Sequence, residues 1–238
     1  MRSVAYIVFS ILFFWSCQIP EPKPAVELTD FQEEAIAYFK EVALGFEFGS
    51  ASPITRKWEE PMRIYVSGYA EGPLYSTLQN VRNEINSLVS DGFELELVAD
   101  SLESNFHIFF GKAGDYVVRY PNQKEYVKSN YGLFSVFWNG RNEINRGHMY
   151  VDTERADSRA QHHLLREELT QSLGLAKDSD KYPDSIFQQS YTYTDEYSEM
   201  DKELIRLLYH PEMTTGLTEI EVDVLLRSIY TSENTLLQ

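Results

Sequence analysis

The sequence predicts an α+β fold with one main domain. Strand-like segments with alternating apolar residues gather in the middle of the chain, and segments with helical periodicity precede and follow them. The composition, 43% hydrophobic and 14% aromatic, is typical of a folded core and too apolar for a disordered chain. A length of 238 residues suits one domain with short appendages.

The first segment of the chain predicts export. Arg2 precedes an apolar run at residues 4–15, which is short for a membrane span and typical of a signal-peptide core. The run ends at Ser16 and Cys17, the only cysteine. This arrangement resembles a bacterial lipoprotein processing site, in which the cysteine is lipidated. A plain secretory signal with an incidental cysteine is the alternative interpretation.

Residues 18–27, "QIPEPKPAVE", carry three prolines and predict an extended spacer. The expected organisation is therefore a signal peptide with a lipobox-like end at 1–17, a Pro-rich spacer at 18–27, and a single domain at 28–238. After the spacer, Thr29 and Gln32 form a capping-box pattern that predicts a helix reaching Gly45.

The centre of the chain alternates between the two periodicities. A β-rich segment at 62–69 is followed by a helical segment with one apolar face at 74–88. Further strand patterns lie at 93–98, 106–110, 133–138 and 148–151. From these segments we expect a mixed or antiparallel sheet packed on helices.

The segment 158–175 returns to helical periodicity. Leu165, Leu169 and Leu173 form an apolar stripe, and His163, Glu167 and Gln171 lie on the opposite face, because residues four apart stack on a helix. A Tyr-rich polar loop follows at 177–199, and helical patterns at 200–209 and 218–230 predict a small helical C-terminal part.

The run "EELTQSLGL" resembles the HExxHxLGL active-site helix of zinc metallopeptidases. Glu167 and Gln171 stand at the histidine positions, so that HExxH is replaced by EExxQ, and Glu168 stands at the catalytic glutamate. More specifically, "REELTQSLGLAKDSDKYPDSIF" followed by "LIRLLYHPEMTTGLT" resembles domain of unknown function 2927, a family of uncharacterised bacterial proteins. The resemblance is detailed over the last third of the chain.

The resemblance implies a zincin-like fold with an active-site-like helix. It implies a general-base position at Glu168 and metal-ligand positions at Glu167 and Gln171, and Lys177 stands where a third histidine would lie. His163, four residues before Glu167, is a further candidate metal ligand. Zinc prefers imidazole and thiolate, so zinc or another divalent cation is not expected to bind tightly.

Three functional interpretations stay open. The favoured one is an exported, lipid-anchored protein of the bacterial envelope whose degenerate metallopeptidase-like domain binds a peptide or protein in a groove. An active metal-dependent peptidase with Glu168 as general base is the alternative, and a purely structural envelope lipoprotein is the second. The acidic pair Glu167 and Glu168 also fits a solvated helix face. A net charge of −16 disfavours nucleic acid as a partner, whereas the lipid anchor would bind a membrane.

Overall fold

A computed structural model describes residues 27–46, 51–69 and 71–236. The predicted signal peptide, including Cys17, and the spacer up to residue 26 lie outside the described residues. Within the described part, no helix combines the length and the apolar character needed to cross a bilayer.

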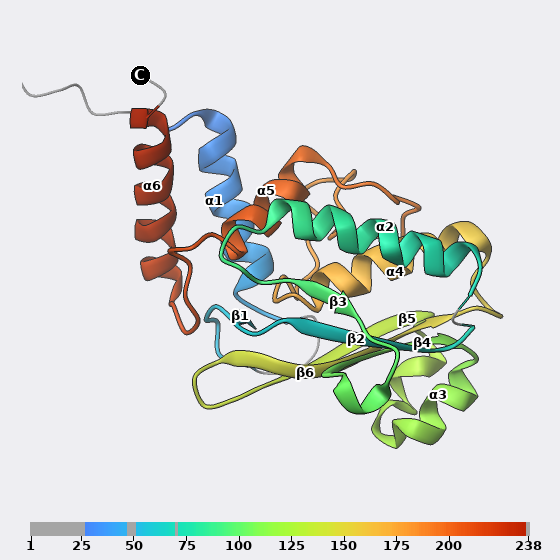
Figure 1. The fold of residues 1–238 in the computed structure, drawn as a ribbon. Coiled ribbons are helices and arrows are strands. Elements are labelled where there is room, and N and C mark those ends of the chain that lie inside the picture. Colours follow the sequence, from blue (N-terminus) through green and yellow to red (C-terminus); the bar gives the residue numbers. More distant parts are fainter. Residues whose placement is uncertain (1–26, 47–50, 70, 237–238) are drawn as a thin grey trace, which may run out of the picture.

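One six-stranded sheet forms the centre of the molecule (Figure 1). Its main path runs β1-β6-β4-β2-β3, and these neighbours are all parallel; β5 alone is antiparallel, and pairs with β6. The sheet is thus mixed but mostly parallel, and the antiparallel alternative is wrong. Helices and loops between the strands return the chain to the same end of the sheet, which makes the strands parallel. The strands are β1 (Lys57–Trp58), β2 (Met62–Gly68), β3 (Leu95–Leu97), β4 (Phe106–Gly111), β5 (Gly132–Trp138) and β6 (Glu143–Asp152).

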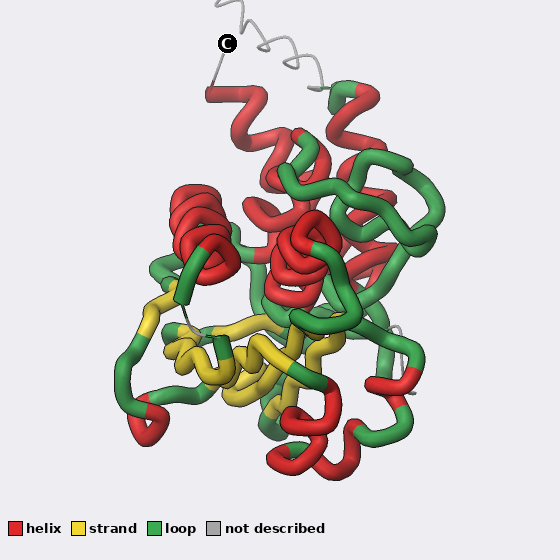
Figure 2. Tube along the Cα trace, turned by 90° about the vertical axis from the view of Figure 1, so that its right-hand side faces the viewer, coloured by secondary structure: helices red, strands yellow, loops and turns green. Residues whose placement is uncertain are grey.

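Most helices cover one face of this sheet (Figures 1 and 2). Helices α2 and α4 lie side by side over the strands, α5 packs on α1 and α2, and α6 packs on α1. The short helix α3 lies on the opposite face, against β4. The helices are α1 (Asp30–Ala43), α2 (Pro73–Leu88), α3 (Ala113–Arg119), α4 (Ser158–Gln171), α5 (Glu199–Leu208) and α6 (Glu219–Leu236).

The apolar faces predicted from the sequence form the core. Leu165 and Leu169 of α4 have no exposed surface, as the apolar stripe predicts; Leu173 is also buried but lies beyond the end of the helix, which is shorter than the predicted segment 158–175. The capping box of Thr29 and Gln32 is present at the start of α1. Phe31 has the spacing of that helix's apolar face, yet it is 42% exposed because it lies in the first turn.

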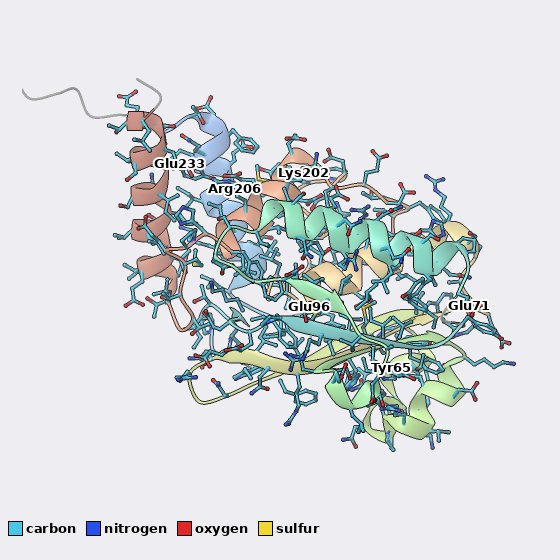
Figure 3. The ribbon with its side chains drawn as sticks, in the orientation of Figure 1. Tyr65, Glu71, Glu96, Lys202, Arg206 and Glu233 are labelled. Atoms are coloured by element: carbon cyan, nitrogen blue, oxygen red, sulfur yellow. The ribbon has the colours of Figure 1, made fainter. Side chains whose placement is uncertain are left out.

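The C-terminal part is tied to the rest of the domain by charge as well as packing. Arg206 of α5 forms an ion pair with Glu233 of α6, with Nη1 and Oε1 2.8 Å apart; Figure 3 labels both residues. Arg206 forms a second ion pair with Glu203. Burial lowers the pKa of Arg206, but the hydrogen bond and charge of Glu203 outweigh it and raise the pKa above its usual value. Ion pairs of Asp223 with Lys40 and of Arg227 with Glu33 join α6 to α1.

Candidate functional site

Helix α4 is fixed at both ends. Asp157 caps its first turn by accepting a hydrogen bond from the amide of Ala160 at 2.9 Å. The helix ends at Gln171. Gly174 then takes a φ of +122°, and its Cα lies against the backbone carbonyl of Arg56. A Cβ at this position would lie 2.0 Å from that oxygen, so only glycine lets the end of α4 come this close to the chain before β1.

A cavity of about 1240 Å³ lies between α4 and β5, and we call it the groove. One wall is the whole of β5, and the other is the polar face of α4. The groove is lined by Glu167, Glu168 and Gln171 of the helix, by Asp178 from the following loop, and by Tyr191 and Tyr193 from the Tyr-rich loop. The structure therefore brings together the predicted site residues of α4; His163 does not line the groove but contacts Glu167 from one turn before it.

His163 is buried and bound through both ring nitrogens. Nδ1 donates to the carbonyl oxygen of Thr194 at 2.6 Å, and Nε2 lies 3.2 Å from the carboxylate of Glu167. Burial on its own lowers the pKa of this imidazole, but the hydrogen bond and charge of Glu167 outweigh it, and the pKa is raised. The cationic form of His163 thus donates from both nitrogens, and neither nitrogen offers a lone pair to a metal.

Gln171 is paired with Asp178. Its amide Nε2 donates to Oδ1 of Asp178, 2.5 Å away. Burial, and then the charge of Glu167, raise the pKa of Asp178 to about 6, although the hydrogen bond from Gln171 acts in the opposite direction. Lys177 stands at the position of a third zinc histidine, but it is exposed, and its neighbour Asp178 is the residue that reaches the groove.

Glu168 lies closer to the sheet than Glu167. Its side chain is 8% exposed and lies against the backbone of β5: a Cβ added to Gly132 would come within 2.8 Å of its Oε1. The helix thus presents Glu167 to the open part of the groove, Glu168 to the wall formed by β5, and the buried Gln171 to Asp178. Glycine at position 132 is what makes room for this carboxylate.

These residues do not fit a catalytic zinc. Such a site needs three protein ligands, mostly imidazoles or carboxylates with free lone pairs. Here His163 is fully used by Thr194 and Glu167, and Gln171 is a neutral amide held by Asp178. Among residues 27–46, 51–69 and 71–236, no three His, Cys, Asp or Glu side chains are grouped so that they could hold a metal ion.

The free edge of β5 borders the groove. Strand β5 pairs only with β6 among the described strands. The amide of Asp152 donates to the carbonyl of Tyr131, its register partner, so Leu133, Ser135 and Phe137 also turn their backbone groups toward β6. The alternate residues Gly132, Phe134 and Val136 therefore point their N–H and C=O groups away from β6, toward the groove.

Aromatic side chains flank this edge, and the sequence did not predict them as part of the site. The rings of Tyr191 and Tyr193 contact each other edge to face, with their centres 5.1 Å apart, and Tyr191 is 62% exposed. The guanidinium of Arg159 lies 4.7 Å from the ring of Tyr193. The run "YTYTDEY" reads as an ordinary surface loop. Contacts with α4 hold it at the groove, among them the Thr194 carbonyl on His163 and the Tyr193 ring on Arg159.

Comparison with known proteins gives one family match. A family model described as "Protein of unknown function (DUF2927)" matches residues 32–228, which extends well beyond the last third of the chain where the motifs lie. The search of curated protein sequences gave no match. A solved structure titled "Structure of myroilysin" aligns with 71% of this chain and 98% of its own, at 10% identity and a TM-score of 0.38. That likeness is too distant to assign a fold or an activity.

Proposed function

Because the chain belongs to the DUF2927 family, whose function is unknown, its activity has to be inferred from the groove, and we propose that the groove binds an extended peptide segment of a ligand or partner protein. The observation that carries this proposal is the free edge of β5. Among the described residues, nothing pairs with the outward backbone donors and acceptors of Gly132, Phe134 and Val136, which lie along the wall of a cavity large enough for several residues. An extended peptide satisfies such an edge by adding to it as a further strand.

The opposite wall supports a preference in the ligand. Glu167 and Asp178 carry negative charge on the side of α4, and the exposed ring of Tyr191 stands beside them. A basic side chain of the peptide would be attracted to the carboxylates and would stack on the ring. We therefore expect peptides with Lys or Arg at alternate positions to bind best.

The same geometry supports a degenerate metallopeptidase-like domain rather than an active one. The zincin-like interpretation rests on the position of α4 beside an antiparallel edge strand and on the motif that resembles HExxH. The residues at the zinc positions are engaged with one another, so the groove keeps the shape suited to a peptide without the ligands for a catalytic zinc.

Export and anchoring complete the proposal. The apolar run at 4–15 and Cys17 support a lipoprotein of the bacterial envelope, and the Pro-rich spacer would hold the domain away from the membrane. In that arrangement the groove is open to the extracytoplasmic space, where peptides and other envelope proteins are available as ligands.

The experiment is a selection from a random dodecapeptide library displayed on phage, followed by binding measurements with the selected peptide in synthetic form. We expect one peptide per chain, and we expect N-methylation of the peptide backbone to abolish binding at every second position, because only alternate amides face β5. The control is the same peptide methylated on its side chains, with every backbone amide left free. Binding without a two-residue period would contradict strand addition, and the absence of any selected binder would favour the structural lipoprotein.

One observation favours the alternative of an active hydrolase: the carboxylate of Glu168 lies in the groove beside the edge strand. We expect dialysed protein to contain less than stoichiometric zinc and to leave a fluorogenic peptide library intact. One zinc per chain that disappears in Glu167→Ala, or hydrolysis that disappears in Glu168→Gln but not in the exposed control Glu60→Gln, would move the peptidase ahead.

A further inference from the structure

A second cavity lies on the face of the sheet that carries α3. It has a volume of about 380 Å³ and lies between the turn that follows α3 and the paired strands β5 and β6. Its side chains include two arginines, a histidine and two aromatic rings: Arg119, Tyr120, Phe137, Arg146 and His148. No Asp or Glu is among the residues that line it. We call it the basic pocket.

The two arginines are unusual in this chain. Acidic residues outnumber basic ones by 37 to 21, yet within the part of the chain that the structure describes neither Arg119 nor Arg146 forms an ion pair with a carboxylate. Both are instead held by rings of the pocket: the guanidinium of Arg146 lies 4.8 Å from the ring centre of Phe137, and that of Arg119 lies 6.0 Å from Tyr120. Their donors are thus positioned without a counter-charge.

His148 adds a directed donor. His148 is 6% exposed, and the ring of Tyr120 stacks on its imidazole with the two ring centres 3.7 Å apart. Its Nδ1 lies 2.6 Å from the hydroxyl of Tyr116. Tyr116 is fully buried, and among the described residues its hydroxyl has no other hydrogen-bond partner, so the hydroxyl hydrogen is satisfied only if Tyr116 donates to Nδ1.

The tautomer of His148 follows from this bond. Burial lowers the pKa of His148 to about 4, so the ring is neutral near pH 7 and carries its single hydrogen on Nε2 when Nδ1 accepts. Within the described residues no hydrogen bond is formed by Nε2. His148, a residue only 6% exposed, lines the basic pocket, so this N–H is a third donor that lacks a protein acceptor among the described residues.

We propose that the basic pocket binds the oxyanion group of a small molecule, a carboxylate or a phosphate, between Arg119, Arg146 and Nε2–H of His148. Two guanidiniums and one neutral N–H are the donors that such a group uses best, and the absence of carboxylates in the lining leaves it unopposed. The volume suits a ligand of a few to about a dozen heavy atoms. The pocket adjoins the groove, because Asn122, Gln123 and Phe137 line both, but Arg119, Arg146 and His148 line only the pocket, so this proposal does not rest on peptide binding in the groove.

The experiment is a titration of the full exported chain, labelled with ¹⁵N at histidine and arginine side chains, with inorganic phosphate in one arm and acetate in the other, at constant ionic strength. We expect saturable shifts of His148 Nε2 and of the two arginine Nε signals in at least one arm. Arg119→Gln and Arg146→Gln should each weaken binding about tenfold or more, since each removes a charge-assisted hydrogen bond. Both side chains are exposed at the pocket mouth, so these variants should keep the fold, which circular dichroism checks.

Arg82→Gln is the matched control, because Arg82 is half-buried on α2, away from the pocket, and its guanidinium bonds only to Asn83 among the described residues. It should leave the titration unchanged. Saturation with phosphate alone would identify a phosphorylated ligand, and saturation with acetate alone a carboxylate. Linear shifts up to about 50 mM anion, or an equal weakening in Arg82→Gln, would overturn the proposal in favour of unspecific attraction to surface arginines.

Discussion

At the scale of single residues, the charge of the groove depends on Asp178. Its carboxylate is partly buried and lies near Glu167, and these two causes raise its pKa to about 6. A raised carboxyl pKa means that the folded protein holds the proton more tightly than the unfolded chain does. The stability that this proton gives is complete below the ordinary pKa of 3.8 and is lost as the pH rises through about 6.

Asp178→Asn should therefore stabilise the protein in a pH-dependent way. Asparagine keeps an oxygen that can accept from Gln171 but cannot ionise, so the variant avoids the cost that the wild type meets above pH 6. We expect the two free energies of unfolding to agree within error near pH 4 and to differ by on the order of 2 kcal/mol at pH 7.5. Urea denaturation at a series of pH values measures this difference, and a constant difference over that range would contradict the assignment.

The sequence predicts part of this site and misses another part for a physical reason. His163, Glu167 and Gln171 are four residues apart on one helix, and local geometry alone places them on one face. Asp178 and Tyr191 belong to a loop without periodicity, and tertiary contacts decide where such side chains lie. The contact between the Thr194 carbonyl and His163, which brings that loop to the helix, has no signal in the sequence.

At the scale of elements, the approach of α4 to the chain before β1 rests on Gly174. This residue combines a φ of +122° with a backbone oxygen that would lie 2.0 Å from a Cβ. Gly92 is the matched case, because its φ is +94° but no atom lies within 4 Å of its Cβ position. Comparing substitutions at Gly174 and Gly92 therefore distinguishes the cost of a strained backbone conformation from the cost of a steric clash.

Gly174→Ala should lower the free energy of unfolding by at least about 3 kcal/mol, because the clash with Arg56 is added to the backbone strain. Gly92→Ala should cost only about 1 to 2 kcal/mol, from the backbone conformation alone. Urea denaturation of both variants gives the comparison. Equal losses would show that α4 can move away from Arg56 without cost, and that the position of the groove wall is not fixed at this point.

Elements with a strong apolar pattern are predicted well, and those without one are not. Helices α1, α2 and α4 and strands β2, β4 and β5 coincide with patterned segments within a few residues, whereas β6 begins well before its predicted segment at 148–151. Helix α3 escapes prediction because it is short and turns Val118 to solvent with 82% of its surface exposed. Strand β1 has two residues, and it exists only because β6 is there to pair with it.

At the scale of the whole molecule, strand order and direction are the features that the sequence leaves open. Alternation of apolar residues predicts strands but not their partners. Strand β5 is antiparallel because a short turn joins it directly to β6, whereas longer connections, such as α2 between β2 and β3, leave the other neighbours parallel. The general class, α+β, depends only on the mixture of elements and is confirmed.

The last prediction concerns the attachment of this domain to a membrane. The signal-like run at 4–15 is followed by Ser16 and Cys17. The three prolines after Cys17 suit a spacer between a lipid anchor and the fold. One acyl chain binds a membrane only weakly, so stable anchoring needs the several chains of a processed lipoprotein cysteine. Cells fed a labelled fatty acid should therefore incorporate label into the wild type and not into Cys17→Ala, whose product should become soluble. Because Cys17 is the only cysteine, the substitution cannot act through a disulfide of this chain, and Ser16→Ala, which keeps a small residue before the cysteine, should remain labelled and membrane-bound. Undiminished labelling of Cys17→Ala would leave the chain as a secreted protein with an incidental cysteine, and the groove would then act free in solution rather than at a membrane surface.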